Sequence, residues 1–176
     1  MLVRILSYHQ VMPAYLDFLS AFGSRTEASD LRFTGFREQT SLAKPPHAMV
    51  IRDLGRSGRQ LQLSYNLKTV GRNLSPARNL LGQEWIFSQA AFHHQFDVEE
   101  GTSLWIITHR SASLRERMME MISIDGRLAD QAISTTDGYL RSSLSTHLLY
   151  CQWTIEEWRE YVKWLEKEVN KEVSNL

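Results

Sequence analysis

The chain has 176 residues, 43% of them apolar and 23% charged, which is typical of one globular domain. Twenty basic and twenty acidic side chains cancel, and the zero net charge argues against nucleic-acid binding, which needs a basic excess or a basic face. The longest unbroken apolar runs have four residues, whereas a bilayer span needs about 20, so we expect no membrane insertion by this chain. One cysteine and no signal-peptide pattern predict a soluble, cytoplasmic protein.

The first predicted element is an amphipathic helix over residues 11–22. Its apolar side chains recur at helical spacing. Pro13 lies in its first turn, where a missing N–H is tolerated, and Gly23 follows its last apolar residue as a stop signal.

Between residues 31 and 108 the apolar period changes from 3.6 to 2, which indicates strands. Residues 61–67 alternate between apolar and polar side chains and predict a half-buried strand with one face in water. Glycine-containing segments at 55–58 and 97–101 predict hairpin loops. The other strands are expected near residues 31–36 and at 49–52, 85–96 and 102–108.

The C-terminal third returns to helical periodicity, with helices expected at 114–122 and 139–152 and an amphipathic one within 154–173. The second is expected to bury Leu140, Leu144, Leu148 and Cys151. Thr154 and Glu157 form a capping-box pattern that predicts the start of the last helix. The chain is therefore predicted to be a single α+β domain: a mostly antiparallel sheet of four or five strands packed with an N-terminal helix and C-terminal helices.

A candidate metal site lies on the predicted strand 85–96. His93 and Asp97 share one face of this strand, and His109 can lie across the hairpin, so a His, Asp, His set could hold a divalent metal. The turn carboxylates Asp97, Glu99 and Glu100 are candidates for weak Mg²⁺ binding through its water shell. The alternative is a polar sheet face satisfied by ordinary hydrogen bonds and a loop kept solvated by its charges.

Two further groups are candidate contact surfaces. The arginines around the first hairpin are expected either to meet an anion or an acidic partner or to be solvated. The tryptophans near the last helix do not share one stripe, so at least one is expected at an interface, together with a neighbouring tyrosine. Cys151 is predicted to be a buried small residue rather than a nucleophile, and no Ser-His-Asp or Cys-His set can be assembled from the sequence. The arginines are Arg52, Arg56 and Arg59, and the aromatic residues are Trp153, Trp158, Tyr161 and Trp164.

Three segments carry a family resemblance: residues 5–13, residues 54–67, and residues 85–97 together with Trp105-Ile106-Ile107. They resemble a domain of filamentous-fungal proteins described as CorA-like transporter-domain proteins, over roughly residues 5–165. The resemblance implies a cytoplasmic α/β domain that leads through a stalk helix into two membrane spans of a pentameric magnesium transporter. The Gly-Met-Asn pore signature of that family is absent, so no pore residue is carried over.

The first functional hypothesis is a non-enzymatic cytosolic regulatory or assembly domain, a homo-oligomer or one part of a chain with a transmembrane segment, with Mg²⁺ as the possible ion. One alternative is a small metal- or ligand-binding enzyme that uses His93, Asp97 and His109. The other is a stand-alone protein-interaction module.

Overall fold

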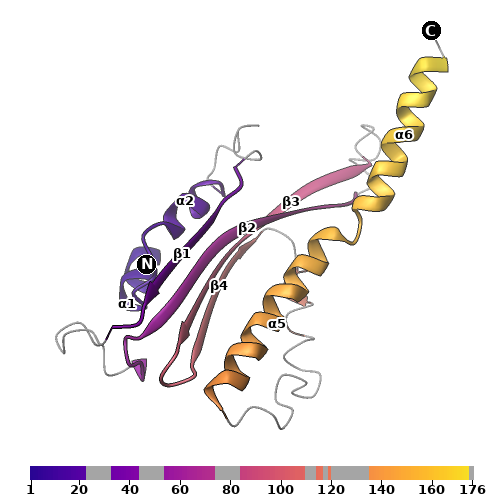
Figure 1. Ribbon diagram of the computed structural model, residues 1–176. Helices are drawn as coiled ribbons and strands as arrows, with labels where there is room; N and C mark the ends of the chain where they lie inside the picture. The colour runs from indigo at the N-terminus through magenta and orange to yellow at the C-terminus, as the bar shows by residue number, and fades with distance from the viewer. Residues whose placement is uncertain are drawn as a thin grey trace.

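The computed structural model describes residues 1–22, 33–43, 54–73, 84–109, 114–116, 119 and 135–174. Its strands form one antiparallel sheet in the order β1-β2-β3-β4. Helices α1 and α2 lie on one face of this sheet, α5 lies on the other, and α6 extends beyond its end (Figure 1). The predicted α+β class is confirmed, and the described sheet has four strands rather than five. The elements are α1 (Leu2–Tyr8), α2 (Tyr15–Ser20), β1 (Phe36–Ser41), β2 (Gln60–Arg72), β3 (Trp85–Asp97), β4 (Ser103–His109), α5 (Thr136–Ile155) and α6 (Trp158–Ser174).

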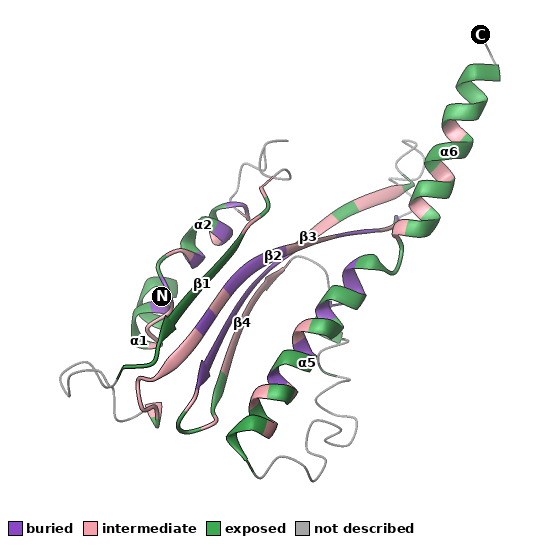
Figure 2. Cartoon of the chain, in the orientation of Figure 1, coloured by how far each residue is buried: buried purple, intermediate pink, exposed green. Residues whose placement is uncertain are grey.

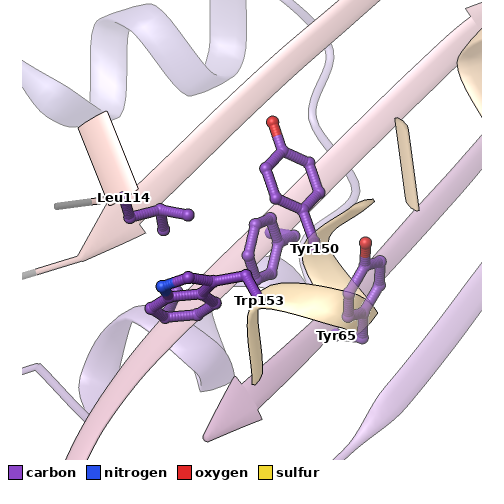
Figure 3. Close-up of a cluster of buried hydrophobic side chains, with 6 residues drawn as sticks. Tyr65, Leu114, Tyr150 and Trp153 are labelled. Carbon is purple, nitrogen blue, oxygen red and sulfur yellow. The ribbon is translucent and has the colours of Figure 1, made fainter. Parts of the chain in front are cut away.

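Strand β3 is the centre of the molecule because helices cover both of its faces (Figure 2). Successive strand residues point to opposite faces. Ala90 and Phe92 accordingly pack with Tyr65, Leu114, Tyr150 and Trp153 on the α5 side (Figure 3). Ala91 packs with Leu6, Met12, Tyr15 and Phe18 on the α1–α2 side. The sheet is therefore the middle layer between two apolar clusters.

The polar face of β2 is buried, and the prediction of a water-exposed face was wrong. Gln62, Ser64 and Asn66 are 1%, 0% and 5% exposed because α1, α2 and the segment before β1 cover them. Each has a hydrogen-bonding partner under this cover: Gln62 accepts from the Met12 N–H, Ser64 bonds His93, and Asn66 bonds the backbone of Phe33 and Gly35. The alternation of apolar and polar residues therefore predicted the strand correctly but did not predict which of its faces is exposed to water.

The N-terminal segment also differs from the prediction of one helix over residues 11–22. The chain forms a separate helix, α1, and α2 begins only at Tyr15. Between them Gln10 has a positive φ of 54°, and the Val11 N–H bonds the Leu6 carbonyl. The Met12 N–H is bonded by the side chain of Gln62 instead of by a helical carbonyl. Pro13 therefore follows the break rather than starting a helix.

Helix α5 presents an unexpected face to the sheet. Its buried residues are Ser143, Thr146, Tyr150, Trp153 and Thr154. The predicted apolar residues do line one side of the helix, but this side faces away from the sheet: Leu144 and Leu148 are 44% and 70% exposed, and Cys151 is exposed. The predicted capping box was also wrong, because Thr154 lies within α5 and its hydroxyl donates to the Cys151 carbonyl. The last helix begins at Trp158.

Several predictions fall outside the described residues. These are the strand at 49–52, most of the helix at 114–122, the first part of the strand near 31–36, and Arg52. The hairpin loop at 97–101 is confirmed between β3 and β4. Residues 60–65 pair with β1, and residues 60–72 pair with β3.

Gly101 in this hairpin offers a sharp test of local packing. Its φ is +68°, a region that side chains disfavour, and a Cβ there would lie 2.9 Å from the Tyr139 ring carbon Cδ2. We expect Gly101→Ala to lower the free energy of unfolding by roughly 1 to 3 kcal/mol, measured by urea denaturation. Gly71→Ala is the matched control, since Gly71 has no positive φ and no atom within 4 Å of the added Cβ. Equal stability of the two variants would contradict this account of the hairpin.

Candidate functional site

A chain of hydrogen bonds links the sheet to α5 through polar side chains that run from the buried interior to the exposed Ser103. The Tyr65 hydroxyl lies 2.6 Å from His147 Nδ1, and His147 Nε2 lies 2.9 Å from His94 Nδ1. His94 Nε2 lies 2.6 Å from the Ser143 hydroxyl, which lies 3.0 Å from the Ser103 hydroxyl. We call this set of five residues the Tyr65–Ser103 relay. It alternates between strands β2, β3 and β4 and helix α5, so it joins layers that the sequence separates widely.

Both imidazoles of the relay are neutral. Burial lowers the pKa of His94 to about 3, with a further lowering because the neighbouring imidazoles of His147 and His93 disfavour a positive charge on its ring. Burial also lowers the pKa of His147 to about 4. A neutral imidazole has one donor and one acceptor nitrogen, so every bond of the relay can be satisfied in one consistent direction, from Tyr65 to Ser103 or the reverse. Protonating both rings would set two N–H donors against each other between His94 Nδ1 and His147 Nε2.

The relay contains the order of groups found in nucleophilic sites. Ser143 contacts His94, and His94 is oriented by His147. However, Ser143 is only 6% exposed and His94 is fully buried beneath α5, stacked on Trp105 at 4.2 Å between ring centroids. An imidazole with a pKa of about 3 is also a weak base at neutral pH. These features fit a structural connection between α5 and the sheet better than a catalytic serine.

The structure does not bring His93, Asp97 and His109 together. His93 lies on the α1–α2 face, where its ring is 5.3 Å from that of Tyr15 and its Nδ1 is 3.0 Å from the Ser64 hydroxyl. His109 pairs with Ala90, whose side chain lies on the α5 face. Because the two histidines are on opposite faces of the sheet, one ion cannot contact both. Within the described part of the chain no group of three or more His, Cys, Asp or Glu side chains is placed to hold a metal.

Asp97 organises the hairpin loops. Its carboxylate accepts four hydrogen bonds, from the Ser57 N–H and hydroxyl and from the backbone N–H groups of Glu99 and Glu100. Burial tends to raise its pKa, but these hydrogen bonds outweigh that effect and the pKa is lowered. Glu99 lies 3.8 Å from Arg59, whereas Glu100 uses only its backbone in this network. The three carboxylates therefore do not converge as Mg²⁺ ligands.

The two described arginines of the first hairpin make internal contacts. Arg56 donates to the His9 carbonyl at 3.0 Å and to the Gln95 side chain at 3.2 Å, and burial lowers its pKa. Arg59 donates to the Leu42 carbonyl at 2.9 Å. Arg56 thus fastens the end of α1 to β3, whereas the Arg59 side chain remains 42% exposed.

Aromatic residues hold the start of α6 against the far ends of β2 and β3. Tyr161 lies 5.5 Å from Trp85 and 5.4 Å from Phe87 between ring centroids, and Trp158 and Trp164 also pack against these two residues. Trp153, by contrast, is 7% exposed inside the α5 cluster (Figure 3). Of the predicted interface aromatics, Trp153 belongs to the core, and the other three attach α6 to the sheet.

The outward faces of α5 and α6 carry unpartnered apolar side chains. On α6, Val162, Leu165, Val169 and Val173 are 57%, 38%, 59% and 64% exposed and recur at helical spacing. On α5 the exposed stripe consists of Leu144, Leu148, Cys151 and Ile155. We call these the α6 stripe and the α5 stripe.

The relay residues Tyr65, Ser143 and His147 were missed by sequence reasoning. His147 occupies a helix that was expected to bury leucines, and Ser143 precedes one of those leucines. The one available signal was His94 itself, which points away from His93 and would need polar partners if its face were covered. Those partners come from positions 49 and 53 residues further along the chain, a distance that no local pattern reveals.

The fold and these contacts define an α+β domain in which a polar relay fixes one helix to a four-stranded sheet and a second helix extends outward. The model of the family described as CorA-like transporters matches residues 1–176. The chain belongs to this family. The comparisons with curated proteins and with solved structures give no match. No helix within the described residues combines the length and the apolarity required to cross a bilayer.

Proposed function

We propose that this chain is a non-enzymatic regulatory or assembly domain of a CorA-like transporter, acting on the cytoplasmic side of the membrane through self-association. The observation that carries the proposal is the α6 stripe. It lies on a helix that extends beyond the sheet, so a second copy of the chain can approach it without unfolding the domain (Figure 1).

The energetics of the stripe favour a partner. A large aliphatic side chain gains roughly 1.5 to 3 kcal/mol when it moves from full exposure to full burial. The four α6 residues are between one third and two thirds exposed, so association can recover part of that amount at each position. The α5 stripe adds a second apolar strip on a neighbouring helix. Membership of a transporter family, together with the pentameric assembly implied by the resemblance, supports a second copy as the occupant.

Light scattering on a sizing column tests this assembly. We expect the wild-type chain to form oligomers at about 100 μM, and Leu165→Glu with Val169→Glu to be monomeric, because each glutamate would be buried without a partner. The control is Asn170→Glu, which adds one negative charge, half of that in the double variant, to an exposed position of α6 outside the stripe. All three proteins are run with EDTA and then with millimolar Mg²⁺.

The outcomes separate the parts of the proposal. A mass that rises only with Mg²⁺ would link assembly to the ion, and a mass unchanged by Mg²⁺ would leave assembly independent of it. A wild-type monomer under both conditions, or loss of the oligomer in the Asn170→Glu control as well, would contradict self-association through the α6 stripe.

A further inference from the structure

A cleft of about 480 Å³ lies where α6 leaves the sheet. Its volume falls within the range typical of small-ligand sites, about 300 to 1,000 Å³. The end of β2, the start of β3 and the first three turns of α6 each contribute side chains to it. The described lining residues are Arg72, Asn73, Glu84, Trp85, Glu160, Lys163, Trp164 and Lys167.

Arg72 is held ready to bind an anion. Its guanidinium carbon lies 5.5 Å from the centre of the Trp85 ring, which is within the range of a cation–π interaction that holds the charged group at the cleft. Among the described residues, no carboxylate lies within ion-pair distance of Arg72 and no acceptor takes a hydrogen bond from its side chain. The N–H donors of a guanidinium lie in a planar fork that can bind an oxyanion with two parallel bonds.

The charges of the cleft leave a positive surplus. Glu160 is paired with Lys163 at 2.9 Å. Lys171 donates a hydrogen bond to Glu168, and this contact is the main cause of its raised pKa. Glu84 contributes a smaller electrostatic share to the same shift. Arg72 also acts on Glu160 through space, and Lys171 is already paired with Glu168, so neither carboxylate of the cleft is fully neutralised by a lysine of its own. The lining has three cations, Arg72, Lys163 and Lys167, against the two carboxylates, so one positive charge is in excess, and Arg72 and Lys167 are the two cations without an ion pair among the described residues.

We infer that this cleft binds a phosphate-bearing polyanion of about nucleotide size, with Arg72 and Lys167 as its anchoring residues. Two cations on separate elements suit a ligand that carries more than one phosphate, since a single small anion would reach them less well. Bound there, the polyanion would join the end of β2 to α6. The inference stands on the cleft and its charges, and it does not depend on self-association through the α6 stripe.

Isothermal titration calorimetry in metal-free buffer tests the site with two probes, sodium tripolyphosphate and ATP. We expect saturable binding with a Kd below about 1 mM for at least one probe, weakening as salt is added. Arg72→Gln and Lys167→Gln should each weaken binding about tenfold, because each removes a charge-assisted contact. Arg37→Gln is the control, since Arg37 is an exposed arginine of β1 whose side chain donates, among the described residues, to the neighbouring Phe36 carbonyl alone.

The affinities measured for the two probes and the three variants decide between the possible outcomes. Equal affinity for the two probes would assign recognition to the phosphate chain, and tighter ATP binding would add contacts to the nucleoside. No saturable binding of either probe at 10 mM would overturn the inference. So would an affinity that Arg72→Gln and Lys167→Gln leave unchanged, or one that Arg37→Gln weakens equally. Because Lys167 lies on an exposed helix surface, its variant keeps the test valid if Arg72→Gln disturbs the strand end.

Discussion

Replacing His94 with alanine should lower the free energy of unfolding by about 3 to 5 kcal/mol at pH 7. The side chain is fully buried, so its loss leaves a cavity against Trp105. It also leaves His147 and Ser143 without the partners that they contact at 2.9 Å and 2.6 Å. Buried polar groups that lose their partner cost about 1 to 3 kcal/mol each, so the cavity and the two orphaned groups act in the same direction. Urea denaturation followed by tryptophan fluorescence measures the change.

The control for this experiment is Ser103→Ala at the other end of the relay. Ser103 is exposed, and water can replace its bond to the Ser143 hydroxyl, so we expect a loss of about 0.5 kcal/mol or less. If His94→Ala cost no more than Ser103→Ala, the relay would not be the connection that fixes α5 to the sheet. A large effect of both variants would mean that Ser143 depends on Ser103 for its position.

Acidification from pH 7 to pH 5 should lower the free energy of unfolding by on the order of 3 kcal/mol. Burial, the first cause for each ring, lowers the pKa of His93 to about 4, of His94 to about 3 and of His147 to about 4, below the 6.5 of an unfolded histidine. Between pH 6.5 and pH 4 the unfolded chain therefore binds protons that the folded chain excludes. Stability is complete above pH 6.5 and falls as the pH is lowered through this window.

The slope of this loss identifies its source. Each histidine that is charged only in the unfolded state adds about 1.4 kcal/mol per pH unit. His147 is half-buried, so we count only part of its shift, which is why the expected total is smaller than the sum for three full shifts. His93→Gln keeps a polar group beside Ser64 and removes one titrating ring, so its stability should fall less steeply between pH 6.5 and pH 5. A slope identical to that of the wild type would exclude His93 as a contributor. The lowered pKa of Asp97 acts below pH 3.8 and does not enter this window.

Strand β2 shows which structural features a local sequence pattern can predict and which it cannot. In β2 the alternation of residues 61–67 predicted a strand correctly, because side chains of a strand must point to opposite faces. It assigned the polar face to water, whereas Gln62 and Ser64 are more deeply buried than the neighbouring leucines. The polar face is dry because α1 and α2 fold back over it and supply hydrogen bonds to it.

Helix α5 shows the same limit. The spacing of Leu144, Leu148 and Cys151 gives a helical stripe, and the helix is present. The stripe does not face the sheet, because His94 on the sheet takes Ser143 and His147 as partners and thereby sets the rotation of the helix. Leaving the buried imidazole of His94 without hydrogen-bonding partners would cost free energy comparable to what the helix would gain by burying its two leucines instead.

The amino-acid sequence by itself determined the class of the fold, the period of each element that it detected, the β3–β4 hairpin and the absence of a long apolar run. These properties depend on residues within about ten positions of each other, where spacing and turn chemistry act directly. Only the tertiary structure decided which face of each element is buried, that His93 and His109 lie on opposite sides, and that α6 joins Arg72 and Lys167 in one cleft. Such relations join residues tens of positions apart, and they are fixed by the pairing of buried polar groups across layers, which no local period encodes.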